Sequence, residues 1–232
     1  MIREALGYLR ESDDVWKTSI IGGVLLLFGF LLIPLFVAWG YVVAVVDRTA
    51  RGDDEAPVFE DWSQLTIDGA KAIAIGLVYS FVPIVVGAIL FGGILLSSGE
   101  TIGSVGGAGL VFSGLLTLGL LLAAAYAFPA ALAHFAEKRR LGAGFDLETI
   151  RPVLWNRTYA TRWLLSAGII LAGSIVTAAL NEIPMIGLLL GAIVSFYALV
   201  AAYYVIGQTW EELHPLPTAE RGGELSSDRP AV

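Results

Sequence analysis

Residues 19–48 read SIIGGVLLLFGFLLIPLFVAWGYVVAVVDR, and this stretch decides the topology of the chain. It is almost wholly apolar, with a single proline, Pro34, near its middle. A straight helix of this length would measure about 45 Å at roughly 1.5 Å per residue, whereas the hydrocarbon core of a bilayer is about 30 Å thick. The stretch is therefore too long for one upright span and too short for two full ones.

The composition identifies the class of protein. Of 232 residues, 56% are hydrophobic and 15% are charged, whereas soluble domains carry about 25% charged residues. The apolar residues stand in long blocks, which predicts a polytopic membrane protein. The first block begins near Thr18 and no small-residue cleavage site follows it, so we expect it to stay in the mature protein rather than act as a signal peptide.

Cysteine, histidine and net charge exclude several kinds of site. The chain has no cysteine and only two histidines, His134 and His214. Disulfides, thiolate metal sites and histidine-rich metal sites are therefore excluded, and we expect no metal or cofactor. The net charge of −7 argues against a nucleic-acid partner. The acidic, lysine-poor aqueous segments favour a salt-rich cytoplasm, in which self-repulsion is screened, and hence a halophilic source.

Four later blocks have spanning length, at residues 71–97, 109–136, 162–181 and 184–207. Together with the opening stretch they predict an all-α, polytopic transmembrane helical bundle.

The linkers between the blocks set the orientation. Linkers 98–109 and 181–184 contain no lysine or arginine, whereas linker 137–162 contains six. Because basic residues stay on the cytoplasmic side, the first two linkers are expected outside and the third inside. Linker 47–70 and the C-terminus are then cytoplasmic as well.

The opening stretch has basic residues on both sides, Arg10 and Lys17 before it and Arg48 within its last turn. Basic flanks favour a segment that enters and returns on one side. Pro34 disfavours helix just before it, so we expect a hairpin of two short helices, 18–33 and 35–47, and a cytoplasmic N-terminus. The alternative is a single tilted span with the N-terminus outside. The bundle thus has four full spans plus either a proline-broken hairpin or one long span.

Three short amphipathic segments precede the crossings, at residues 1–17, 58–71 and 145–162. Apolar residues share one face in each segment, which predicts helices in the membrane interface; short cytoplasmic helices that cap the bundle are the alternative. Asp146 is a candidate N-cap of the third. We expect residues 1–211 to form one integral membrane domain and residues 212–232 to form a disordered, acidic cytoplasmic tail.

No ionisable residue lies in the middle of an apolar block, which argues against a proton-coupled transporter and against catalysis within the membrane. His134 is expected to be an interfacial residue. Hydroxyl side chains in the spans either line a polar path or form hydrogen bonds between helices, and the second is favoured; they are Tyr79, Ser80, Thr117, Tyr126, Ser174, Thr177, Ser195, Tyr197, Tyr203 and Tyr204.

Prolines and glycines supply candidate hinges and packing positions. Pro34, Pro83, Pro129 and Pro184 are candidate helix breaks. Gly187 and Gly191 form a G-x-x-x-G pattern, which allows helices to approach closely, either within the chain or between two copies.

Residues 20–80 resemble domain of unknown function 4013, a family of prokaryotic multi-pass membrane proteins, many of them from salt-loving archaea. The resemblance rests on these residues: Pro34, Gly40, Tyr41, Arg48, Gly52, Pro57, Trp62, Asp68, Gly69 and Pro83. It adds Gly40 and Tyr41 to the candidate packing positions. The spacing between Pro57 and Trp62 is longer than the family's usual Pro-Glu-Trp. The resemblance implies an integral membrane protein and carries no activity.

These observations predict a non-enzymatic integral membrane protein of the cell membrane, such as a scaffold or envelope component. The alternative is a channel or transporter for a small neutral or apolar solute, and an enzyme acting on lipid is the weakest possibility because no catalytic constellation is visible. The expected partners are the lipid bilayer and, as an open possibility, further copies of the chain.

Overall fold

A computed structural model describes residues 2–8, 15–53, 55–97, 104–184 and 186–214. The described residues form helices and no strand, which confirms the all-α class. The α-helices are α1 (Ile2–Gly7), α2 (Val15–Leu27), α3 (Ile33–Ala50), α4 (Trp62–Ser97), α5 (Ser104–Lys138), α6 (Leu147–Leu154), α7 (Arg157–Asn181) and α8 (Gly187–Leu213), with 3-10 helices η2 (Gly29–Leu31) and η3 (Leu141–Phe145).

Five of the described helices, α3, α4, α5, α7 and α8, are long and apolar enough to cross a membrane. Helix α2 has 13 residues and measures only about 20 Å at 1.5 Å per residue, which is less than the thickness of a bilayer core. The described chain therefore has the composition of a polytopic membrane bundle with one short apolar helix before it.

The opening stretch is broken, as expected, but not at the proline itself. Helix α2 ends at Leu27, η2 follows, and α3 begins at Ile33 with Pro34 in its first turn. Proline fits this position because the first N–H groups of a helix have no acceptor within the helix. The break therefore lies before Pro34, and α3 continues to Ala50, so the predicted helices 18–33 and 35–47 are shifted.

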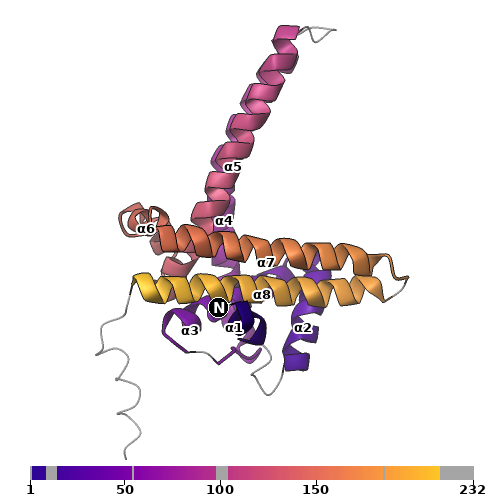
Figure 1. The fold of residues 1–232 in the computed structure, drawn as a ribbon, viewed down its shortest axis with the longest axis vertical. Coiled ribbons are helices and arrows are strands. Elements are labelled where there is room, and N and C mark those ends of the chain that lie inside the picture. Colours follow the sequence, from indigo (N-terminus) through magenta and orange to yellow (C-terminus); the bar gives the residue numbers. More distant parts are fainter. Residues whose placement is uncertain (1, 9–14, 54, 98–103, 185, 215–232) are drawn as a thin grey trace, which may run out of the picture.

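Two long antiparallel hairpins dominate the shape (Figure 1). Helices α4 and α5 form the first and helices α7 and α8 the second, here called the α4–α5 arm and the α7–α8 arm. The arms run in clearly different directions in Figure 1 and meet near α6. Helix α3 joins them, since it packs against α4, α5 and α8.

Glycines set the closest approach, where α3 crosses α4. A Cβ built on Gly40 would lie 1.8 Å from the Leu65 carbonyl oxygen, and one on Gly69 would lie 1.7 Å from the Phe36 carbonyl oxygen. No side chain fits at either position. The buried core forms two clusters on either side of α3: one includes Val42 and Val43 with residues of α4, α5 and α8, and the other includes Tyr41 and Val45 with residues of α8.

The amphipathic segments do not form three equal units. The second, 58–71, runs into the span, because α4 is continuous from Trp62 to Ser97. Helices α1 and α6 are short and separate, and the predicted N-cap of α6 is confirmed: the Asp146 carboxylate accepts hydrogen bonds from the Thr149 N–H at 3.4 Å and the Thr149 hydroxyl at 2.9 Å.

Two segment boundaries differ from the expectation. Helix α5 begins at Ser104, inside the predicted linker 98–109. Helix α8 continues to Leu213, so Glu212 and Leu213 are helical rather than part of a tail. The remainder of the predicted tail, from residue 215 on, lies outside the described residues.

Candidate functional site

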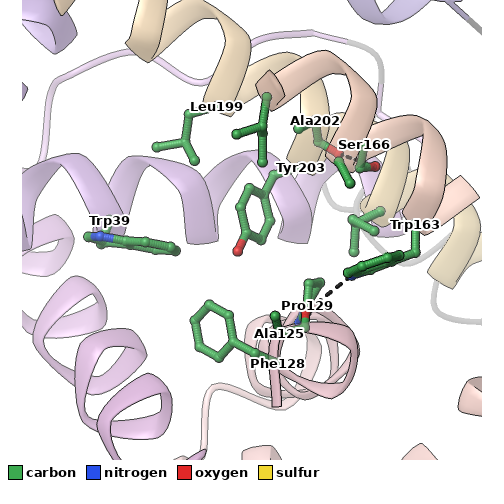
Figure 2. A pocket seen from close by; sticks show the side chains of 12 residues that line it. Trp39, Ala125, Phe128, Pro129, Trp163, Ser166, Leu199, Ala202 and Tyr203 are labelled. Carbon is green, nitrogen blue, oxygen red and sulfur yellow. Dashed lines mark hydrogen bonds between the residues drawn. The ribbon is translucent and has the colours of Figure 1, made fainter. Parts of the chain in front are cut away.

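A cavity of about 310 Å³ lies where the two arms meet (Figure 2). Its walls come from α3, α5, α7 and α8 and are mostly aromatic or aliphatic. The lining residues are Trp39, Ala125, Phe128, Pro129, Trp163, Ser166, Ala167, Ile170, Leu199, Ala202, Tyr203 and Ile206. We call this space the arm cavity. It contains no Asp, Glu, Lys, Arg or His among its described lining residues, so it suits an uncharged occupant.

A second cavity, of about 570 Å³, lies between α3 and the α4–α5 arm. Trp39, Ala125 and Phe128 line both cavities, so the two spaces meet at these residues. The rings of Trp39 and Phe128 pack edge to face with centroids 5.7 Å apart, and Trp39 meets Tyr203 in the same way at 5.8 Å. An aromatic cluster therefore separates the two spaces.

Most polar groups around the arm cavity already have partners. The Ser166 hydroxyl donates to the Ala202 carbonyl at 2.9 Å, and the Trp163 indole N–H donates to the Ala125 carbonyl at 3.1 Å. Tyr203 differs. Its side chain is 6% exposed, its hydroxyl points into the cavity in Figure 2, and it makes no hydrogen bond with any described residue.

Several other hydroxyls in the spans form hydrogen bonds between helices or to neighbouring segments. Tyr126 donates to the Leu154 carbonyl at 2.7 Å, Tyr159 donates to the Tyr126 carbonyl at 2.7 Å, and Tyr79 donates to the Gly144 carbonyl at 3.1 Å. The hydroxyls of Thr177 and Ser195 lie 2.9 Å apart between α7 and α8. These contacts agree with the favoured interpretation, hydrogen bonds between helices, but Thr117 and Ser174 donate to carbonyls within their own helices. The Tyr41 and Thr49 hydroxyls are buried and have no partner among the described residues.

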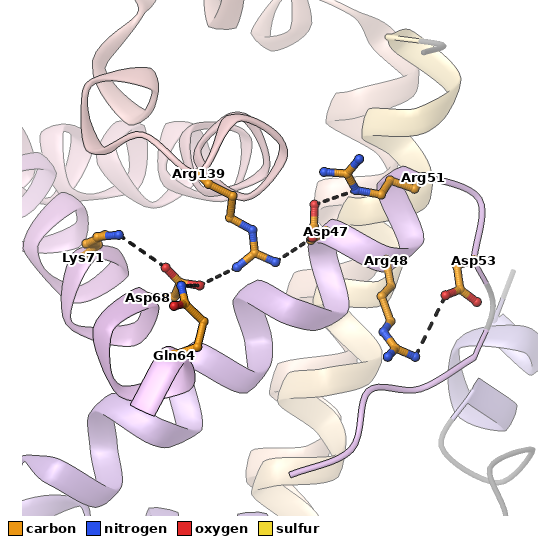
Figure 3. A network of polar contacts seen from close by, with 8 residues as sticks. All are labelled: Asp47, Arg48, Arg51, Asp53, Gln64, Asp68, Lys71 and Arg139. Atoms are coloured by element: carbon orange, nitrogen blue, oxygen red, sulfur yellow. Dashed lines mark hydrogen bonds and ion pairs between the residues drawn. The ribbon is translucent and has the colours of Figure 1, made fainter. Parts of the chain in front are cut away.

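An ion-pair network ties three helices together at one end of the molecule (Figure 3). Arg139, just past α5, binds Asp68 of α4 and Asp47 of α3, with 2.6 Å between its guanidinium and the Asp47 carboxylate. Asp68 also accepts from the Gln64 amide at 2.9 Å and lies 3.5 Å from the Lys71 ammonium. Because the Asp68 side chain is only 3% exposed, this is a buried carboxylate held by several donors.

Arg139 has an unusual backbone conformation as well. Its φ is +54°, in the left-handed region that favours glycine just after a helix. Burial alone would lower the pKa of Arg139, but its contacts with Asp47 and Asp68 outweigh that effect and hold the pKa above its ordinary value. The guanidinium therefore remains charged and keeps both ion pairs.

A stack of rings lies near the same end. The Trp210 ring stacks on His214 at 4.4 Å and on His134 at 5.6 Å, and its indole N–H donates to the Glu137 carboxylate at 2.8 Å. Burial lowers the pKa of His214, so its neutral form is favoured. The Nδ1 atoms of both histidines have no hydrogen-bond partner within the described part of the chain. His134 is 5% exposed and so is buried in protein.

We call the end that carries these groups the charged end. It is defined by Asp47, Asp68, Arg139 and a further ion pair between Arg162 of α7 and Glu212 of α8. No group of three or more His, Asp or Glu residues with metal-binding geometry occurs in the described ranges.

The predicted hinge and packing residues do not form one site. Pro83 and Pro129 lie inside α4 and α5, which continue through them. Pro34 lies in the first turn of α3, and Pro184 lies in the turn between α7 and α8.

The predicted packing positions make close contacts. A Cβ on Gly187 would lie 2.0 Å from the Leu180 carbonyl oxygen, and one on Gly191 would lie 2.8 Å from the Asn181 side chain, so both glycines face α7. Tyr41 is fully buried and stacks on Phe59 at 4.5 Å.

Sequence reasoning missed the groups that converge. Trp39 and Phe128 were not candidate site residues, and Tyr203 was one of ten hydroxyls expected to pack. An aromatic residue inside an apolar block is an ordinary packing residue in sequence, so only the meeting of α3, α5 and α8 shows that these rings share a cavity. The Asp47–Arg139–Asp68 network was likewise not predicted.

The model of one family, described as a protein of unknown function (DUF4013), matches residues 25–182. No curated protein and no solved structure is significantly similar to the chain.

Proposed function

Because the chain belongs to the DUF4013 family of proteins of unknown function, we propose that it is a non-enzymatic integral protein of the cell membrane with a structural role, such as a scaffold or envelope component. The observation that carries this proposal is the separation of its surfaces: apolar side chains cover the arms, and ionisable groups gather in ion pairs at the charged end.

Large apolar side chains are exposed along the α4–α5 arm. The exposed fractions are 66% for Leu77, 65% for Phe81, 67% for Phe112 and 64% for Leu115. An apolar surface this extensive is unfavourable in water and favourable against lipid. It supports a bilayer as the partner of the arm.

The charged end supports a location at one membrane face. Ion pairs there join α3, α4 and α5 through Arg139, and α7 and α8 through Arg162. Charged groups are costly in hydrocarbon, so this end belongs in the headgroup region or in water. The positive-inside rule favours the cytoplasm for this end and for the C-terminus. Five full crossings would put the N-terminus outside, so a cytoplasmic N-terminus requires α2 and α3 to enter and return on one side.

Membrane extraction and thiol labelling test the proposal. The chain lacks cysteine, so single cysteines placed at Asp53 and Glu182 give a clean signal. We expect the protein to stay in the membrane pellet at alkaline pH, and an impermeant maleimide added to intact cells to label only Glu182→Cys. Extraction into the supernatant would disprove the membrane location, and labelling of Asp53→Cys would disprove the orientation.

The absence of enzymatic activity on lipid is tested by replacing His134 and Glu137, which are titratable residues near each other. We expect lipid composition and turnover in cells to be the same for the wild type and for a His134→Gln, Glu137→Gln double variant. Faster or slower lipid turnover in the variant would favour an enzyme instead.

A carrier for a small neutral or apolar solute is a second candidate. The observation that favours it is the pair of cavities that meet at Trp39 and Phe128 and together adjoin α3 and both arms. Pockets for small ligands are typically concave, mostly apolar and furnished with a few polar groups. A carrier function predicts that such a solute crosses vesicles faster when they contain the protein.

A further inference from the structure

The Tyr203 hydroxyl is the feature of the arm cavity that packing does not explain. The residue is only 6% exposed, and no described residue forms a hydrogen bond with its hydroxyl. The hydroxyl oxygen is not among the enclosed unpartnered atoms, so it opens into the cavity that Tyr203 lines. Such a hydroxyl has an unused donor, which water or a ligand can satisfy. Phenylalanine would fill the same space without a polar group. The hydroxyl is therefore available to a ligand that accepts a hydrogen bond.

The position of Tyr203 makes bulk water a poor candidate. Tyr203 lies ten residues before the end of α8 at Leu213, which is about 15 Å along a helix at 1.5 Å per residue. This distance equals about half the thickness of a hydrocarbon core. If α8 crosses the bilayer upright, the hydroxyl lies deep among the chains, beyond the reach of most headgroups, where water is scarce.

The walls specify the rest of the ligand. Trp39, Phe128 and Trp163 present ring surfaces to the cavity, and Ile170, Leu199 and Ile206 present aliphatic ones. Aromatic rings pack well against flat, conjugated molecules. Because the described lining includes no Asp, Glu, Lys, Arg or His, a charged ligand would lack a counter-ion there.

The size of the space allows a ring with a tail. The arm cavity holds about 310 Å³, and the adjoining cavity holds about 570 Å³ beyond the Trp39–Phe128 pair. Both values lie in the range of small-molecule sites, about 300–1,000 Å³. The Trp39–Phe128 pair stands between the two spaces, so an apolar chain from a ring at Tyr203 reaches the second cavity only past these rings.

We propose that the arm cavity binds an uncharged, flat, ring-bearing lipid with a carbonyl oxygen, the chemistry of a quinone, and that the Tyr203 hydroxyl donates a hydrogen bond to that carbonyl. The rings of Trp39, Phe128 and Trp163 enclose the head, and the apolar tail extends toward the second cavity. The inference takes the membrane setting from the proposed function, and it concerns binding, not transport.

Thermal stability of the purified full-length protein in detergent tests this binding, with decylubiquinone as the probe. A ligand that binds only the folded state raises Tm, and the stabilisation grows as RT ln(1 + L/Kd), where L is the free ligand concentration. We expect Tm to rise with decylubiquinone concentration for the wild type. The Tyr203→Phe variant keeps the ring and removes only the hydroxyl, so its apparent Kd should be about five to ten times higher, as for the loss of one hydrogen bond.

Tyr204→Phe is the matched control, because this neighbouring hydroxyl accepts a hydrogen bond from the Gln208 amide at 2.7 Å and does not line the arm cavity. It should bind as tightly as the wild type. Ala167 lines the cavity, so Ala167→Phe should fill the space and abolish the shift in Tm. Dodecane, which has no oxygen, should produce the same small shift in the wild type and in Tyr203→Phe.

Several outcomes would overturn the inference. Equal binding by Tyr203→Phe and the wild type would remove the role of the hydroxyl, and an undiminished shift in Ala167→Phe would place the ligand elsewhere. A wild-type shift with dodecane as large as that with decylubiquinone would mean that the cavity accepts any apolar chain. No shift at all would exclude a quinone. None of these outcomes depends on the alkaline extraction that tests the membrane location.

Discussion

Arg139 combines an unfavourable backbone with a favourable side chain. Its φ of +54° would suit glycine, and a non-glycine residue there has a conformational cost. Its guanidinium, however, joins Asp47 and Asp68 across α3, α4 and α5. Because Asp68 is buried, loss of the arginine would remove the guanidinium that offsets the cost of burying the Asp68 charge. The ion pairs explain why arginine, rather than glycine, occupies this position of positive φ.

Replacing Arg139 with glycine should lower the free energy of unfolding. Relief of the backbone strain contributes about 1 kcal/mol, and loss of two ion pairs, one of them to the buried Asp68, removes about 3 kcal/mol, so the expected net loss is about 2 kcal/mol. Thermal unfolding in detergent measures it. Arg140→Gly, the exposed neighbour, should change stability by less than about 0.5 kcal/mol. An Arg139→Gly variant as stable as the wild type would contradict the role of the network.

Asp146 gives a pH-dependent prediction. Hydrogen bonds from Thr149 lower the pKa of Asp146 from its ordinary value of 3.8. A group whose pKa is lower in the folded state stabilises the protein above its unfolded pKa and loses that effect as pH falls through the folded pKa. Asp146→Ala should therefore have a lower Tm than the wild type at pH 7, and the difference should shrink below about pH 3.8.

Asp146→Asn separates the cap from its charge, because asparagine caps helices about as well as aspartate and does not titrate. Its Tm relative to Asp146→Ala should stay constant across this pH range. A difference between wild type and Asp146→Ala that persists at pH 2 would show that the stabilisation does not come from the carboxylate.

Helix α3 is the element on which the arrangement depends. It begins after a break, crosses α4 at Gly40 and reaches the charged end at Asp47. The break itself is strained, since Leu32 has φ +63° and ψ −51°, and its side chain is 58% exposed. The free energy that α3 gains by packing against its neighbours must therefore exceed the free-energy cost of the strained Leu32 backbone at its start.

Leu32→Gly should raise the free energy of unfolding by about 1 kcal/mol, because glycine adopts positive φ without a steric penalty. Leu31 is the matched control: it is also exposed, at 56%, but it ends η2. Leu31→Gly should lower stability by about 0.5–1 kcal/mol. If both variants behave alike in thermal unfolding, the strain at Leu32 is not real.

The crossing of α3 and α4 should not tolerate a methyl group. A Cβ on Gly40 would collide with the Leu65 backbone, so Gly40→Ala must push the helices apart. We expect a loss of about 3 kcal/mol or more. Gly119 of α5 has no atom within 4 Å of a built Cβ, so Gly119→Ala should be neutral or stabilise by up to about 1 kcal/mol. A tolerated Gly40→Ala would disprove the close approach.

The molecule as a whole consists of two arms and a connecting helix. The spans were predictable because hydropathy alone marks a helix long enough for a bilayer, and α4, α5, α7 and α8 fall on the predicted blocks. The short α6 and its cap at Asp146 were predictable because capping chemistry is local.

Some features were not predictable, for physical reasons. No helix breaker lies between Trp62 and Lys71, so an amphipathic segment and an apolar span of the same period join into one α4. The directions of the arms depend on how α3 packs between them, which no local pattern encodes. The same holds for the cavity, because Trp39, Phe128 and Tyr203 come from three separate helices.

The divergence of the arms has a mechanical consequence (Figure 1). The arms meet near α6 and run in clearly different directions from there, so they cannot both cross one flat bilayer upright. In the proposed membrane setting, one arm must tilt toward the plane of the bilayer or the angle between the arms must close, and closing would compress the walls around Trp39 and Tyr203.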